Sequence, residues 1–190
     1  MPVLLEKDAN MPLPKMYKVK QSFKKEHIED VEAAVQEQFE REEISEKIYK
    51  GAKVAVAVGS RGIKNLLTIV RTTVDCLKEK GAEPFIVSAM GSHGSGSEEG
   101  QREVLTGYGI TEESLGVPVI TTVDSTLLGY TKNKIPVYFD QAAQTADLII
   151  PINRVKLHTD FVGDLQSGLC KMLVIGLGNQ IGCSAIHEED

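Results

Sequence analysis

Several residue types are scarce in this chain, and each scarcity excludes a class of function. Tryptophan is absent, and aromatic residues make up only 5% of the 190 residues. A surface that stacks nucleobases needs aromatic rings, so we expect no such platform. The net charge is −6, and lysine and arginine form no dense block. Because nucleic-acid binding requires a concentrated basic patch, the sequence predicts no nucleic-acid partner.

Cysteine and long apolar runs are also scarce. The three cysteines, Cys76, Cys170 and Cys183, are odd in number and form no CxxC pair. They are typical of free thiols in a reducing cytoplasm rather than of disulfides or a zinc site. No stretch approaches the roughly 20 apolar residues that a membrane-spanning helix needs, and the N-terminus lacks the long apolar core of a signal peptide. We therefore expect a cytoplasmic protein without a membrane partner.

The remaining composition is that of an ordinary globular domain, with 42% hydrophobic and 25% charged residues. No internal repeat or low-complexity linker is present, so residues 1–190 are interpreted as a single domain. The run Lys53–Val58 predicts a buried strand, the apolar stripe of Leu66–Leu77 a helix, and Phe85–Val87 a second strand. A strand, helix and strand with short joints indicate a parallel sheet.

Further strands are predicted at Pro118–Val123 and Leu148–Ile150, with a hairpin across residues 127–139 and a helix capped by Asp140. The predicted fold is α/β: a Rossmann-like layered domain with a mostly parallel sheet flanked by helices, plus the hairpin. Loops at the carboxyl edge of such a sheet are where ligands bind.

A glycine- and serine-rich loop, Ala89–Glu98, follows the second strand. Its glycines allow the backbone to approach a ligand closely. Ser95 and Glu98 fit a capping box at the start of the next helix, where backbone N–H groups bind anions well. The alternative is a surface connection without a ligand. His93, in the middle of the loop, favours the functional interpretation.

The stretch Asn153–His187 follows the last predicted strand and carries the most unusual residue, Lys171, inside an apolar run. Such a lysine either extends its ammonium to solvent or is desolvated, with a depressed pKa and nucleophilic character. Taken alone, Lys171 and the nearby histidines are more often surface residues than functional ones.

Three strand ends should bring Arg61, His93 and His158 into one crevice, closed by the element that carries Lys171 and His187. An arginine suits a carboxylate or a phosphate, and two histidines can serve as acid and base near neutral pH. No histidine or cysteine spacing matches a zinc site.

At these residues the sequence resembles a family, the nickel-pincer lactate racemases, through their N-terminal domain. The resemblance runs from about Val54 to His187. The segments that carry it are VAVGSRG, AMGSHGSGSEEGQ, ADLIIPINRVKLHTDF and SGLCKMLVIGLG, followed by the terminal histidine.

The resemblance implies a nickel-pincer nucleotide, a pyridinium mononucleotide that holds nickel between two sulfurs and a carbon, tethered to Lys171. His187 matches the nickel ligand, His93 and His158 the acid/base pair, and Arg61 the residue that binds the substrate carboxylate. The Gly-Ser loops are expected to contact the cofactor through Ser60, Gly91, Ser92 and Gly94.

The segment between His158 and Lys171 departs from lactate racemase itself, which suggests a divergent homologue with another small-molecule 2-hydroxy acid as substrate. Family members continue into a C-terminal domain that covers the site, and the chain ends at Asp190. The chain alone is therefore expected to be inactive. It should expose an apolar docking surface, which favours self-association as a homo-oligomer.

The leading hypothesis is the catalytic domain of a 2-hydroxy-acid racemase or epimerase that works by hydride transfer to the tethered cofactor. One alternative is a non-catalytic domain that binds a phosphorylated or carboxylated small molecule through its Gly-Ser loops. Another is a redox enzyme that uses the same cofactor in one direction.

Overall fold

The computed structural model describes residues 15–23, 26–157, 162–164 and 167–187, and it confirms the α/β class. Four parallel strands form the central sheet in the order β3-β2-β1-β6. Their bounds are β1 (Lys53–Val58), β2 (Glu83–Ser88), β3 (Val119–Ile120) and β6 (Leu148–Ile152). The predicted hairpin is present as an antiparallel pair, β4 (Ser125–Tyr130) and β5 (Pro136–Asp140).

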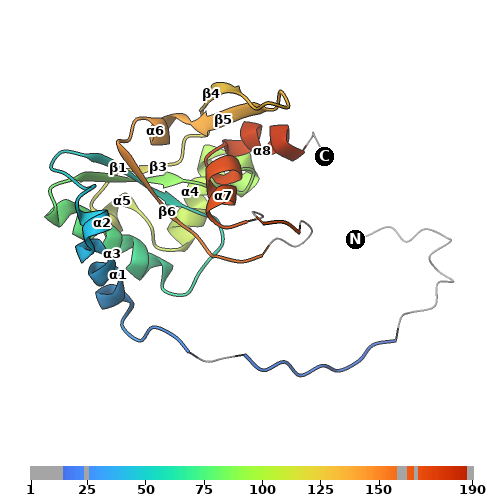
Figure 1. The fold of residues 1–190 in the computed structure, drawn as a ribbon, viewed down its shortest axis with the longest axis horizontal. Coiled ribbons are helices and arrows are strands. Elements are labelled where there is room, and N and C mark those ends of the chain that lie inside the picture. Colours follow the sequence, from blue (N-terminus) through green and yellow to red (C-terminus); the bar gives the residue numbers. More distant parts are fainter. Residues whose placement is uncertain (1–14, 24–25, 158–161, 165–166, 188–190) are drawn as a thin grey trace.

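Helices lie on both faces of the sheet (Figure 1). Those before and between the first strands are α1 (Val31–Glu40), α2 (Glu42–Ser45), α3 (Leu66–Glu79), the 3₁₀ turn η2 (Gly94–Gly96), α4 (Glu98–Gly107) and α5 (Glu112–Leu115). Those nearer the C-terminus are α6 (Gln141–Gln144), α7 (Leu169–Lys171), the π-helical turn η3 (Met172–Gly176) and α8 (Asn179–His187).

Strand β1 is the centre of the core because its side chains alternate between two buried layers. Val54, Val56 and Val58 pack with the apolar stripe of α3, whereas Ala55 and Ala57 face the layer that contains Met172 and Leu177. Each fully buried aliphatic side chain of this kind contributes roughly 1.5–3 kcal/mol through removal from water. The small alanines on the second face allow η3 to pack close to the sheet.

The hairpin is joined to the C-terminal helix through a buried polar contact. Asp140 caps α6, as predicted, by accepting a hydrogen bond from the Ala143 amide at 2.8 Å. Its other oxygen accepts from Asn179 Nδ2 at 2.9 Å, at the start of α8. Burial raises the pKa of the Asp140 carboxyl, and these hydrogen bonds partly oppose that rise. The contact fixes where α8 begins.

Two local predictions were wrong. Ser97, not Ser95, caps α4: its Oγ accepts from the Gly100 amide, while Ser95 lies in η2 with φ of 58°. Strand β3 is shorter than predicted because only Val119 and Ile120 pair with β2.

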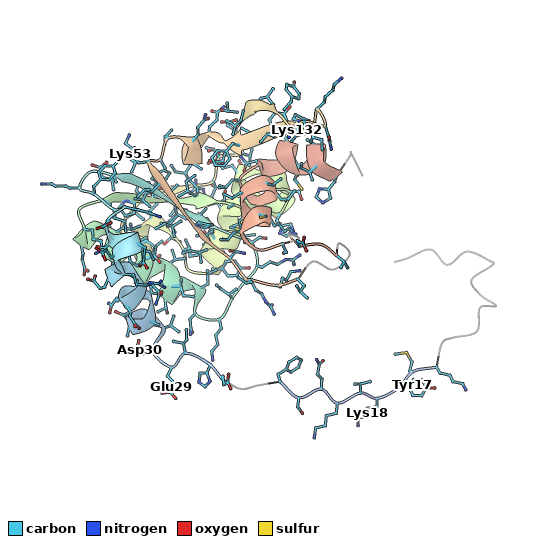
Figure 2. All side chains as sticks on the ribbon, viewed as in Figure 1. Tyr17, Lys18, Glu29, Asp30, Lys53 and Lys132 are labelled. Atoms are coloured by element: carbon cyan, nitrogen blue, oxygen red, sulfur yellow. The ribbon has the colours of Figure 1, made fainter. Side chains whose placement is uncertain are left out.

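Residues 15–23 lie away from the body of the molecule, and Figure 2 shows Tyr17 and Lys18 among them. Within the part of the chain that the structure describes, no single helix is long and apolar enough to cross a membrane. The α7–η3 segment and α8, bent by 106°, satisfy length and composition only as a pair, which core helices also do.

Candidate functional site

The functional residues predicted from sequence gather at the carboxyl edge of the sheet. Val58 is paired with Ser88 on one side and with Ile152 on the other, so β1, β2 and β6 end at the same level. The loops that follow them and the α7–α8 region enclose a cavity of about 270 Å³. Its lining includes Ser60, Arg61, Ser92, His93, Lys171 and His187.

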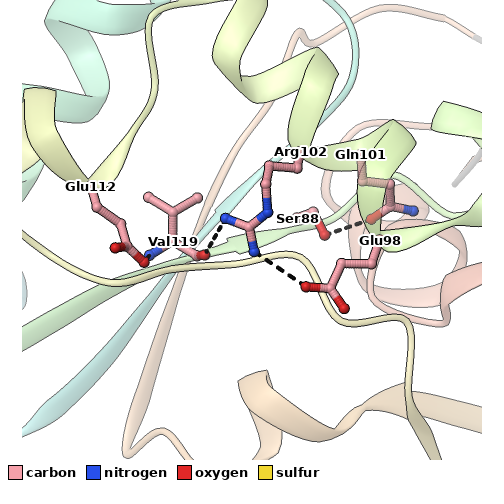
Figure 3. Close-up of polar contacts among 6 residues, drawn as sticks. All are labelled: Ser88, Glu98, Gln101, Arg102, Glu112 and Val119. Atoms are coloured by element: carbon pink, nitrogen blue, oxygen red, sulfur yellow. Dashed lines mark hydrogen bonds and ion pairs between the residues drawn. The ribbon is translucent and has the colours of Figure 1, made fainter.

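The loop after β2 is held in shape by one buried amide, Gln101 of α4. Its Nε2 donates to the carbonyl oxygens of Gly91 at 3.1 Å and His93 at 3.4 Å. Its Oε1 accepts from Ser88 Oγ at 2.5 Å, a contact drawn in Figure 3. Because Gln101 is fully buried and anchored at both ends, it fixes the backbone that presents His93.

The imidazole of His93 is oriented by the loop after β1. Its Nδ1 is hydrogen-bonded to Ser60 Oγ, and the Ser60 carbonyl accepts from Tyr108 Oη at 2.7 Å. The pKa of His93 lies below its ordinary value. Partial desolvation is the largest cause, and the positive charges of Arg61 and Lys171 lower the pKa further. The ring is therefore held as a neutral imidazole near neutral pH, with Nε2 left for a ligand.

Glycines bring the C-terminal element against the same loop. A Cβ on Gly91 would lie 2.8 Å from the carbonyl oxygen of Ile175, and one on Gly176 would lie 2.8 Å from that of Ala89. The Gly91 amide donates to the Gly176 carbonyl at 3.2 Å. Only residues without a side chain allow two backbones to approach so closely. The contact places η3 directly beside the His93 loop.

Lys171 is the last residue of α7 and immediately precedes the π-helical turn. The turn is closed by a hydrogen bond from the Leu177 amide to the Met172 carbonyl at 2.9 Å. Met172 is buried beside Gly59, whereas Lys171 is exposed and lines the cavity. The sequence left two alternatives for this ammonium, extension to solvent or desolvation, and the structure shows an exposed Lys171. Single π turns of this kind are frequent at functional sites.

His187 closes the other side of the cavity from the end of α8. Its Nδ1 lies 2.7 Å from the Cys183 carbonyl oxygen, one helical turn earlier. A carbonyl only accepts, so Nδ1 carries the proton and the neutral ring keeps its lone pair on Nε2. The buried Cys183 thiol lies 3.6 Å from Ser92 Oγ, which joins α8 to the loop after β2.

Positive charge dominates the cavity although the chain is acidic overall. Arg61, Arg154, Lys156 and Lys171 line it, and no aspartate or glutamate is among the lining residues that the structure describes. None of these four side chains forms an ion pair within the described ranges. An electropositive pocket of this kind attracts small anions.

Not every predicted residue lies in the cavity. Gly91 and Gly94 are absent from its described lining. Their backbones pack instead against Ile175 and against the Gly100–Gln101 peptide of α4, which explains the need for glycine. Their role in cofactor binding stays a prediction. His158 lies outside the described residues. Arg61, His93, Lys171 and His187 are brought together, and their chemical roles also stay predictions.

Sequence reasoning missed Arg154, Lys156 and Cys183. The first two follow β6 in the same way that Arg61 follows β1, so the rule about carboxyl ends of parallel strands could have identified them. Arg154 and Lys156 are separated by one residue, Val155, and alternate residues of an extended chain lie on the same side. In the structure Val155 is 82% exposed. Cys183 lies one turn before His187, a spacing that puts two side chains on one helix face.

Metal-binding side chains form no cluster in the part of the chain that the structure describes. Within residues 15–23, 26–157, 162–164 and 167–187, no group of three or more histidine, cysteine, aspartate or glutamate residues could hold a metal ion.

Comparison with known protein families identifies the family of the chain. The family described as the lactate racemase N-terminal domain matches residues 5–189. No curated protein matches the chain. The family match spans the three strand ends and the α7–α8 region that build the cavity.

Proposed function

Because the chain belongs to the lactate racemase N-terminal domain family, we propose that it is the catalytic domain of a 2-hydroxy-acid racemase or epimerase. One observation carries the proposal: Arg61, His93, Lys171 and His187, from three separate segments, line one cavity at the carboxyl edge of the sheet. This cavity is the place where an α/β sheet binds its ligand.

The cavity suits the cofactor implied by the family resemblance, a lysine-tethered nickel-pincer nucleotide. Lys171 offers an exposed primary amine at the cavity wall. His187 offers Nε2 as a neutral imidazole ligand, since its Nδ1 is occupied by the Cys183 carbonyl. One histidine is sufficient because the pincer supplies the remaining ligands. When bound, the cofactor would supply a pyridinium ring that can accept hydride, together with a nickel ion.

The remaining side chains of the cavity would bind and deprotonate the substrate. Arg61 would hold the carboxylate of the hydroxy acid through paired N–H groups. His93, neutral and oriented by Ser60, would take the proton of the C2 hydroxyl on Nε2. His158 is proposed as the partner that takes the same proton from the mirror-image substrate. Hydroxyl deprotonation suits an imidazole better than direct removal of the poorly acidic C2 proton.

The test uses the full-length protein, purified from its native host and incubated with single enantiomers of 2-hydroxy acids in heavy water. Racemisation with little deuterium at C2 is expected, because C2 hydrogen leaves and returns as hydride. Extensive deuterium at C2 would indicate two-base proton abstraction and contradict the mechanism. Net formation of a 2-keto acid would instead favour a one-directional redox enzyme.

A second candidate function is a non-catalytic domain that binds a carboxylated or phosphorylated small molecule. The observation that favours it is the set of four cationic side chains around the cavity. Metal analysis separates the two candidates. A catalytic domain of this family should contain about one nickel per chain when produced in its native host, whereas a binding domain has no need of nickel.

A further inference from the structure

We infer that the cavity selects 2-hydroxy acids that carry a second anionic group, a further carboxylate or a phosphate, and that Arg154 and Lys156 bind that group. The inference rests on the proposed function and deepens it. The observation behind it is that four cationic side chains line one small cavity, which is more than a monocarboxylate substrate requires.

A monocarboxylate substrate accounts for only one of the four cations. A single guanidinium binds a carboxylate through two parallel hydrogen bonds, so Arg61 is sufficient for that group. Tethering of the cofactor would convert the Lys171 amine to a neutral amide-like group. Arg154 and Lys156 then remain, and neither has a carboxylate partner in the described parts of the chain.

The placement of the two residues directs their charges to the substrate. Arg154 and Lys156 follow β6, the direct neighbour of β1, whose loop carries Arg61. The Gly59 amide donates to the Ile152 carbonyl at 3.4 Å, which holds the two loops together. Both cationic side chains line the cavity, whereas the intervening Val155 does not. The chain thus presents alternate residues to one side, as an extended segment does.

The charges themselves favour an anionic occupant. Cations gathered around a cavity of about 270 Å³ repel one another, and each added anion relieves that repulsion. The same chemistry could serve the phosphate of the cofactor nucleotide. We assign it to the substrate because Arg154 and Lys156 follow β6, the strand paired with β1, whose loop carries Arg61, the residue proposed to bind the substrate carboxylate.

The first arm of the test measures binding without turnover. Lactate, malate and 3-phosphoglycerate are titrated calorimetrically into the full chain produced without cofactor. Malate or 3-phosphoglycerate should bind at least roughly tenfold more tightly than lactate, the gain expected from one charge-assisted hydrogen-bond pair. The tighter of the two identifies carboxylate or phosphate as the second group. Equal affinity of all three would overturn the inference.

Variants locate the effect. Arg154→Gln and Lys156→Gln should each reduce the preference for the dianion, and the double variant should abolish it. Matched controls are Arg71→Gln on the exposed side of α3 and Lys132→Gln at the hairpin tip, where Figure 2 places it. The controls should keep the full preference. A preference retained by the double variant would overturn the assignment, and circular dichroism confirms that each variant is folded.

The second arm uses protein produced in the native host. The double variant should lower the ratio of kcat/KM for malate to that for lactate by roughly tenfold or more. Loss of the Lys171 adduct with an unchanged ratio would show that the two cations hold the nucleotide phosphate, and would overturn the inference.

The two arms also separate this inference from the proposed function. Racemisation of monocarboxylates without any preference for dianions would leave the proposed function standing and refute the inference. Dianion binding through Arg154 and Lys156 in a protein that racemises nothing would refute the proposed function and leave the anion site standing.

Discussion

His187 Nδ1 and the carbonyl oxygen of Cys183 lie 2.7 Å apart on successive turns of α8. This hydrogen bond fixes the tautomer and the orientation of the ring, so that Nε2 is the nitrogen available to a metal. Metal-binding histidines are usually oriented in this way, by donating their other ring N–H to a carboxylate, a backbone carbonyl or a water molecule. This hydrogen bond therefore leads to a specific hypothesis, that His187 binds a metal through Nε2.

Replacement of His187 with alanine should lower the nickel content of natively produced protein while leaving the fold intact. The fold is expected to survive because the side chain is exposed at the end of α8. Inductively coupled plasma mass spectrometry measures the nickel, with His27→Ala in the N-terminal segment as the control. Unchanged nickel in His187→Ala would refute the assignment.

Lys171 should carry a covalent adduct in protein from the native host. Its amine is exposed to the cavity, whereas the neighbouring Met172 is buried, so the modification can be accommodated without unfolding. Peptide mass spectrometry should find added mass on the peptide that contains Lys171 and none on the peptide that contains Lys132. Active protein with an unmodified Lys171 would contradict the prediction. Production in a host without the cofactor pathway should give no adduct.

The imidazole of His93 should titrate below its ordinary pKa of 6.5 in the chain without cofactor. Desolvation is the main cause and the charge of Arg61 adds to it, so Arg61→Gln should move the pKa upwards. Between the lowered pKa and 6.5 the unfolded chain binds more protons than the folded one. Stability should therefore rise with pH through that window and fall as pH drops through it. Histidine resonances followed by NMR measure the pKa. An unchanged pKa of His93 in Arg61→Gln would argue against a close approach of the Arg61 guanidinium to the His93 ring.

Ser60→Ala should lower kcat by roughly tenfold, because His93 would lose the partner that orients its ring. The Tyr108 hydrogen bond to the Ser60 carbonyl involves the backbone and remains, so stability should change little. Ser60→Thr keeps a hydroxyl and should restore most of the rate. Steady-state kinetics with the preferred hydroxy acid test this. Equal rates in Ser60→Ala and wild type would show that the contact does not orient the base.

Gly91→Ala should destabilise the chain by roughly 1–3 kcal/mol. The new Cβ would meet the Ile175 carbonyl at 2.8 Å, and the backbone at Gly91 has φ of 58°. Gly107→Ala is the matched control, since a Cβ there meets nothing within 4 Å and lies in helix α4. The control should be neutral or slightly stabilising. Urea denaturation measures both, and equal stabilities would contradict the close backbone packing.

Much of the fold could be predicted because its signals are local. The apolar run Lys53–Val58 has few structural options other than a buried strand, and the stripe of α3 repeats with the helical period. Asp140 was predicted as a cap because an aspartate before a short helical run satisfies the amides that the helix leaves free. The hairpin required only two strand-forming runs and a polar turn.

Less local features were missed or misjudged. Ser95 and Ser97 both suit a cap, and the positive φ of Ser95, imposed by the tight η2 turn, decided for Ser97. The π-helical turn after Lys171 leaves no trace in the residue pattern. It is maintained where Gly176 and Gly91 allow two backbones to meet. Such contacts join residues far apart in the chain, so no window of sequence contains both partners.

For the site, the sequence determined which side chains are available, and strand order determined that Arg61 and His93 would lie near each other. Tertiary structure decided the rest. It added Arg154 and Lys156, because β6 pairs with β1 and ends level with it. It assigned a backbone acceptor to His187 and a hydroxyl partner to His93. Hydrogen bonds and charge act over a few ångströms in space, and only the folded chain sets which groups come within that range.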